Sequence, residues 1–136
     1  MARSYVNPPS LFESVPHGFS QAVVSSGRTV HVSGQTAWDA GKRILGGKDL
    51  ASQARYALEN LRVAMRACGG DLSNVVSLRI YVVDLDPSDP AQASVIGDAL
   101  REFFPADARP ASTWIGVAAL ARPEFLIEIE AVGALD

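Results

Sequence analysis

Two glutamates stand two residues apart in an alternating stretch near the end of the printed sequence. Between Phe125 and Val132, Glu128 and Glu130 alternate with apolar residues, which is the pattern of a β-strand with one buried face. Their carboxylates therefore share a face, with side chains about 7 Å apart. Such a carboxylate acts as a general acid or base at neutral pH if burial raises its pKa. Otherwise it belongs to a solvated or ion-pairing face, with Arg79 of a neighbouring strand as a partner.

The stretch ARPASTWIGVAAL, residues 108–120, holds a second group of chemically capable residues. Arg109 precedes a predicted strand at 111–118, where Ser112 and Trp114 share a face because they are two residues apart. A guanidinium binds an anion through a charged fork, whereas a serine hydroxyl gives one neutral hydrogen bond. Trp114 is either a packed aromatic of the core or an interface, or a wall on which a planar or cationic substrate stacks.

The sequence predicts no metal and no cofactor. The two histidines, His17 and His31, lack any paired metal-ligand spacing, and Cys68 is the single cysteine, which favours a reducing, cytoplasmic location. No apolar run approaches the ~20 residues that span a bilayer, so no membrane partner is expected. We expect the partners to be a small-molecule ligand and further copies of the chain.

The 136 residues predict a single domain, 1–136, in which residues 1–18, rich in proline, form an irregular arm. The formal net charge is −3, with no cluster of Lys and Arg. Because binding to a phosphate backbone needs such a cluster, we expect no nucleic acid partner.

Periodicity predicts an α+β fold in the order ββαβαββ, with both helices on one face of a mixed sheet. The opposite face mixes carboxylates with aliphatic side chains, which favours burial between subunits. The predicted elements are a strand hairpin within 20–35 around the turn SSGR, a helix at 49–68, a strand at 75–84, a helix from Asp89 and Pro90 to Pro105, and strands at 111–118 and 125–132.

Four stretches give the chain a resemblance to the RidA (YjgF-type) family of reactive-intermediate deaminases. They are VHVSGQ at 30–35, QARYALENLRVAMRACGGDLSNVVSLRIYVVDL at 53–85, RPASTWIGVAAL at 109–120 and IEIEAV at 127–132. The resemblance implies a chorismate-mutase-like fold, a barrel-like homotrimer, and clefts between subunits. In those clefts, enamines or imines derived from amino acids are hydrolysed to 2-oxo acids and ammonia without metal or cofactor.

The resemblance also assigns roles to individual residues. Glu128 matches the acidic residue that positions or activates water, and Ser33 matches a pocket serine. Phe19 stands where many members have a tyrosine, and Trp114 replaces a smaller residue on the pocket strand.

The largest departure from the family pattern is Ser112, which stands where the deaminases have a carboxylate-binding arginine. Charge-assisted hydrogen bonds contribute roughly 1.5–3 kcal/mol each and a neutral one about 1 kcal/mol, so loss of the fork weakens a carboxylate substrate by about two or three powers of ten. Arg109, three residues upstream, is a candidate to reach the same pocket.

These observations leave three functional hypotheses. The first is an imine or enamine hydrolase acting in a cleft between subunits, and the second is a non-catalytic metabolite-binding or regulatory protein of the same fold. The third is a ribonuclease, which the acidic charge balance disfavours.

Overall fold

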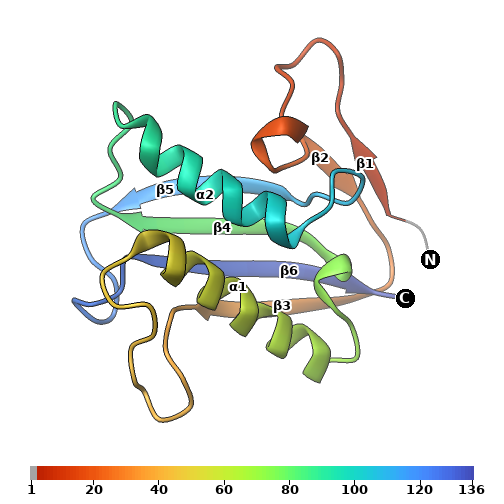
Figure 1. Ribbon diagram of the computed structural model, residues 1–136. Helices are drawn as coiled ribbons and strands as arrows, with labels where there is room; N and C mark the ends of the chain where they lie inside the picture. The colour runs from red at the N-terminus through yellow and green to blue at the C-terminus, as the bar shows by residue number, and fades with distance from the viewer. Residues whose placement is uncertain (1–2) are drawn as a thin grey trace.

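The computed structural model describes residues 3–136 and has the α+β architecture expected from the sequence (Figure 1). Both helices, α1 and α2, cover the same face of one sheet. The elements in chain order are β1 (Ser4–Val6), the 3-10 turn η1 (Val15–His17), β2 (Ala22–Val24), β3 (Arg28–Gln35), α1 (Leu50–Ala67), the 3-10 turn η2 (Leu72–Asn74), β4 (Val75–Val83), α2 (Pro90–Phe103), β5 (Ala111–Val117) and β6 (Ile127–Leu135).

The main sheet has four strands in the order β3-β6-β4-β5. β6 pairs antiparallel with β3 and with β4, whereas β4 and β5 are parallel and connected through α2. The mixed sheet predicted from the sequence is thus confirmed, with β3 and β5 as its two edges.

Alternation gives this sheet two unlike faces. Ile80 of β4 lies opposite Ile129 of β6 and beside Trp114 of β5, and these side chains face the helices. Tyr81 lies opposite Glu128 on the other face, which no helix covers. We call the two sides the helix face and the open face.

Both helices begin as the sequence predicts. Asp49 caps α1 by accepting a hydrogen bond from the backbone N–H of Ser52, and Asp89 caps α2 in the same way from Ala91. Gly69 ends the first helix with a φ of 90°, the left-handed conformation that glycine adopts without strain. The apolar sides of both helices pack on the sheet, in a core that includes Leu58, Leu61, Met65, Leu78, Ile80, Ile96, Leu100, Ile127 and Ile129.

The predicted hairpin within 20–35 is wrong. β2 pairs with β1, at Tyr5 opposite Val23, and forms a separate two-stranded sheet, while β3 joins the main sheet beside β6. At the turn SSGR the chain therefore passes from the two-stranded sheet to the main sheet and does not close a hairpin. The arm also contains the short strand β1 and the turn η1, where the sequence indicated only irregular structure.

A buried glutamine fixes the loop that leads into β6. The side-chain amide of Gln53, on α1, donates to the carbonyls of Gly47 (2.7 Å) and Glu124 (2.9 Å), and its oxygen accepts from the N–H of Leu126 (2.9 Å). Because Leu126 lies two residues before Glu128, these bonds help to hold the start of the strand that carries this carboxylate.

In the part of the chain that the structure describes, neither helix has the length and apolar character needed to cross a membrane.

Candidate functional site

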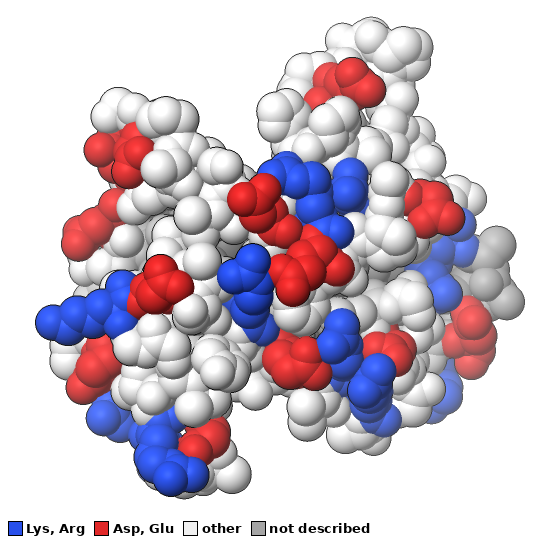
Figure 2. All heavy atoms as spheres, in the orientation of Figure 1, with Lys and Arg blue, Asp and Glu red and all other residues white. Residues whose placement is uncertain are grey.

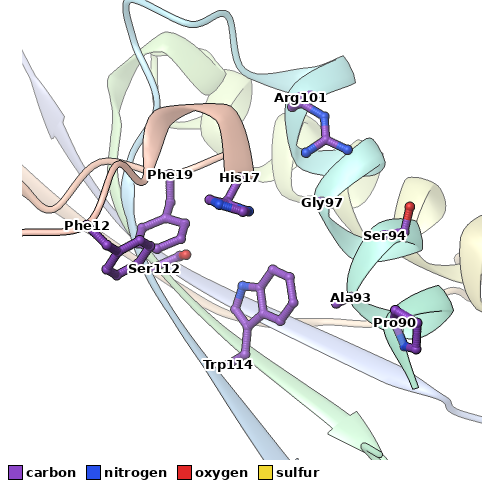
Figure 3. A pocket seen from close by; sticks show the side chains of 10 residues that line it. All are labelled: Phe12, His17, Phe19, Pro90, Ala93, Ser94, Gly97, Arg101, Ser112 and Trp114. Atoms are coloured by element: carbon purple, nitrogen blue, oxygen red, sulfur yellow. The ribbon is translucent and has the colours of Figure 1, made fainter. Parts of the chain in front are cut away.

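A cavity of about 570 Å³ lies on the helix face, between α2, the edge strand β5 and the arm (Figure 3). Ser112 and Trp114 reach it from β5, and Phe19 reaches it from the segment directly after the arm. These three predicted site residues therefore share one site. We call this cavity the aromatic pocket; its lining residues are Phe12, His17, Phe19, Pro90, Ala93, Ser94, Gly97, Arg101, Ser112 and Trp114.

The register of β5 explains why Ser112 and Trp114 face the pocket. They lie beside Leu78 and Ile80 of β4, whose side chains belong to the core under the helices. Among residues 3–136, the Ser112 hydroxyl is the one buried side-chain polar group without a hydrogen-bond partner. Burying such a group unpaired costs about 1–3 kcal/mol, and no hydrogen bond within the described chain offsets this cost.

Aromatic rings form the arm side of the pocket. Phe12 packs edge to face on Phe19, with ring centroids 5.9 Å apart, and on His17, at 6.1 Å. Phe12 is nevertheless 64% exposed. Phe12 was not among the predicted site residues, because an arm without periodicity gives no indication of where its side chains point.

Arg109 does not line the aromatic pocket. Its guanidinium is buried and donates to the carbonyl of Phe104 (3.2 Å) and to that of Val15. Burial, followed by the positive charge of Arg101, lowers the pKa of Arg109. The side chain thus joins the arm to the end of α2 and lies outside the lining of the pocket, so this cavity gives no support to the prediction of Arg109 as a substrate-binding residue.

A different arginine, Arg101 on α2, lines the pocket. Its Nη1 donates to the carbonyl of Pro16 (2.9 Å), its Nη2 to the carboxylate of Asp98, and its side chain is 35% exposed. Helical spacing contains the signal that identifies it. Pro90, Ala93, Ser94, Gly97 and Arg101 recur at three- and four-residue steps, so they share one side of α2.

Glu128 lies on the open face, away from the aromatic pocket. Burial, followed by the charge of Glu130, raises the pKa of Glu128 above its ordinary value of 4.5. Tyr81, opposite Glu128 in the register, donates its hydroxyl hydrogen bond to Glu130. A Cβ built on Gly34 would lie 2.2 Å from Oε2 of Glu128, so the carboxylate lies against the bare backbone of this glycine.

Ser33 lies on the edge strand β3, at the opposite edge of the sheet from Ser112. It precedes Gly34 at an irregularity in the pairing of the edge strand β3 with β6, between Val32 and Gln35. We call Ser33, Gly34, Tyr81, Glu128 and Glu130 the glutamate face. Apart from Arg109, the predicted site residues of a single chain thus fall into two groups, towards opposite edges of its sheet.

Charges on the surface drawn in Figure 2 are mixed, with Lys and Arg interspersed among Asp and Glu rather than gathered in one patch. Within residues 3–136, no group of three or more His, Cys, Asp and Glu is arranged to hold a metal ion.

Comparison with protein families finds one match that spans most of the chain. The model described as "Endoribonuclease L-PSP" matches residues 13–135. The human protein "2-iminobutanoate/2-iminopropanoate deaminase" is 33% identical over 116 residues, which cover 84% of this chain and 77% of the human protein. "Protein DfrA" of Myxococcus xanthus is 33% identical over 115 residues, covering 84% of this chain and 82% of that protein.

Solved structures agree with this match. The crystal structure of YyfB from Yersinia pestis, a Rid-family protein of unknown function, has a TM-score of 0.92 and 43% identity, over 99% of this chain and 100% of that one. RidA from an Antarctic Psychrobacter species has a TM-score of 0.68 and 28% identity, over 86% of this chain and 88% of that one.

Proposed function

Because the chain belongs to the RidA (YjgF-type) family, we propose that it hydrolyses the C=N bond of an imine, or of the enamine that tautomerises to it, and releases ammonia. The observation that carries this proposal is Glu128, a partly buried carboxylate whose pKa is raised. A raised pKa suits a group that must accept and return a proton near neutral pH.

The proposed reaction balances with this one carboxylate. As a water oxygen bonds to the imine carbon, Glu128 accepts a proton from the water. Return of this proton to the nitrogen gives a carbinolamine. Glu128 then accepts the proton of the carbinolamine hydroxyl and passes it to the nitrogen as the C–N bond breaks, so that ammonia leaves and the carbon keeps the oxygen as a carbonyl. Every atom of the products comes from the imine and one water molecule.

The two groups of site residues become one site if copies of the chain meet edge to edge. The glutamate face lies towards edge β3, and the aromatic pocket lies at edge β5. In a cyclic oligomer each interface joins two different surfaces, so one edge of a copy meets the other edge of its neighbour. We propose a homotrimer in which Ser33 and Glu128 of one copy complete the pocket formed by Phe19, Ser112 and Trp114 of the next.

The test is ammonia release from imines generated freshly by an amino-acid oxidase from aliphatic, aromatic and basic precursors. We expect the wild type to accelerate release for at least one precursor class, and Glu128→Gln to lose about 10²- to 10⁴-fold of that acceleration. Glu124→Gln, a matched change in an exposed loop, should leave it intact. No acceleration with any precursor would exclude the hydrolase.

A specific observation also favours the alternative of a metabolite-binding protein without turnover. The pocket has Ser112 where the resemblance places an arginine, but its cavity and aromatic lining are intact. Stabilisation of the fold by small metabolites, in a sample that hydrolyses no imine, would identify this function, and its loss in Trp114→Ala would locate the ligand.

A further inference from the structure

We propose that the aromatic pocket binds planar aromatic carboxylates, with the ring against Trp114 and the Phe12–Phe19 pair and the carboxylate at Arg101. The inference deepens the proposed function and rests on it, because the bound molecule is a substrate only if the protein hydrolyses imines. It states that the imines hydrolysed here derive from aromatic rather than small aliphatic amino acids.

The size of the pocket favours a ligand larger than a three-carbon imino acid. Its volume of about 570 Å³ lies within the range of about 300–1,000 Å³ typical of small-molecule sites. A three-carbon ligand would leave most of this space to water, in contact with apolar walls. An aromatic ring displaces that water and buries the walls.

Trp114 and Phe19 provide surfaces for a flat ring. Trp114 packs against the core and extends into the cavity from β5. Phe19 lies across from α2 in the close-up view (Figure 3). The ring planes of Phe12 and Phe19 meet at 61°, and most of the Phe12 side chain is exposed. A bound aromatic ring would cover part of this exposed surface and gain the offset or edge-to-face contacts that such rings prefer.

The charge of the lining selects an anion. Of the ten described residues that line the pocket, Arg101 is the permanent cation and none is a carboxylate. Its guanidinium has five N–H donors, of which one bonds the Pro16 carbonyl and one the Asp98 carboxylate. Three donors remain on a side chain that is partly open to solvent.

Gly97 helps to aim this guanidinium at the cavity. A Cβ on Gly97 would lie 3.1 Å from Nη1 of Arg101, which shows that the guanidinium folds back along α2 over the glycine. Figure 3 shows the group turned towards His17 and the cavity rather than away from the helix. Arg101 lies on α2, whereas Ser112, where the resemblance places an arginine, lies on β5. The carboxylate of the ligand thus binds on the helix side, at Arg101.

The test uses calorimetric titration of the full chain with three stable probes. Phenylpyruvate carries both ring and carboxylate, pyruvate lacks the ring, and phenylacetone lacks the carboxylate. We expect phenylpyruvate to bind at least tenfold more tightly than either of the others. Equal or tighter binding of pyruvate would overturn the inference.

Two substitutions test the contact with Arg101 separately from folding. Arg101→Ala should lower the affinity for phenylpyruvate at least tenfold and change the affinity for phenylacetone by less than twofold. Asp98→Asn removes the carboxylate that competes for Arg101 and should raise the affinity for phenylpyruvate by about two- to fivefold. Arg43→Ala, a matched loss of an exposed arginine outside the pocket, should change neither. Phenylpyruvate binding that is indifferent to both Arg101→Ala and Asp98→Asn would overturn the assignment of the anion to Arg101.

The failure of this inference and that of the proposed function give different results. Glu128-dependent ammonia release from an alanine-derived imine, without selective binding of phenylpyruvate, contradicts the aromatic specificity alone. Selective binding of phenylpyruvate without hydrolysis of any imine contradicts the hydrolase alone.

Discussion

The aromatic pocket and the glutamate face are held in place by different means. Both carboxylates of the glutamate face lie on β6, an inner strand with a neighbour on each side. The pocket lies at the edge strand β5 under an arm that two arginines hold by its carbonyls, Arg101 at Pro16 and Arg109 at Val15. The proposed proton-transfer group thus lies on an inner strand of the sheet, whereas the proposed ligand-binding surface lies at an edge strand and is closed by the arm.

The largest expected effect separates the two arginines of the pocket region. Arg109→Ala leaves the partly buried carbonyl of Val15 and the buried carbonyl of Phe104 without this donor and should cost about 2–4 kcal/mol of the free energy of unfolding. Arg101→Ala, on a partly exposed side chain, should cost less than about 1 kcal/mol. Chemical denaturation of both variants measures the difference. Equal stabilities would mean that Arg109 does not anchor the arm.

Trp114→Ala should weaken phenylpyruvate by about 30-fold, because the floor of the pocket is lost and a central aromatic contact typically contributes about 2 kcal/mol. Trp114→Phe keeps an aromatic ring and should lower the affinity for phenylpyruvate less than fivefold. Calorimetric titration gives both values, with thermal melting as a check on folding. If alanine and phenylalanine behave alike, the ring of Trp114 makes no contact with the ligand.

Gly34→Ala tests the glutamate face in the same manner. The new Cβ would overlap Oε2 of Glu128, so the carboxylate must move. Because displacements near 1 Å can cost up to about 10²-fold in rate, we expect a loss of about tenfold in kcat for imine hydrolysis, with phenylpyruvate affinity unchanged. Gly41→Ala meets only an ordinary contact, 3.4 Å from Asp39, and is the matched control. An unchanged kcat would argue against Glu128 as the proton-transfer group.

The smallest predicted effect is a shift in pH dependence. A general base works when deprotonated, so the rate should fall as the pH drops through the pKa of Glu128, which burial and the charge of Glu130 raise. Glu130→Gln removes that charge and should move the acidic limb of the kcat profile to lower pH. Tyr81→Phe removes the hydrogen bond to Glu130 but not the charge, and should move the limb less. A limb that stays fixed in Glu130→Gln would assign it to another group.

Local rules were sufficient to predict most of the fold. Asp49, Asp89 and Gly69 give capping signals that depend only on near neighbours, and the helices begin and end there as predicted. Alternation in β6 also separates Glu128 and Glu130 from the buried isoleucines, as expected. The hairpin at SSGR failed because β1, which pairs with β2, lies in the arm, and a three-residue strand is too short to leave a pattern.

The site was harder to predict because it depends on long-range packing. Strand spacing correctly placed Ser112 and Trp114 on one face, but nothing in the sequence indicates that this face is the helix side and that of Glu128 the open side. Arg109 lies close to Ser112 along the chain, and this proximity suggested a role in binding. The structure instead directs its guanidinium to backbone carbonyls, while Arg101, eleven residues before Ser112, reaches the pocket.

The central claim, that one site is assembled from two copies of the chain, is tested most directly by mixing two variants. Glu128→Gln lacks the glutamate and Trp114→Ala lacks the pocket floor; the two are co-refolded in equal amounts, and imine hydrolysis by the isolated oligomer is measured. If each site takes its glutamate from one copy and its pocket from the next, one interface in four joins two intact halves, and activity should rise to about a quarter of the wild-type rate. Activity no higher than the mean of the two parent variants would contradict the account.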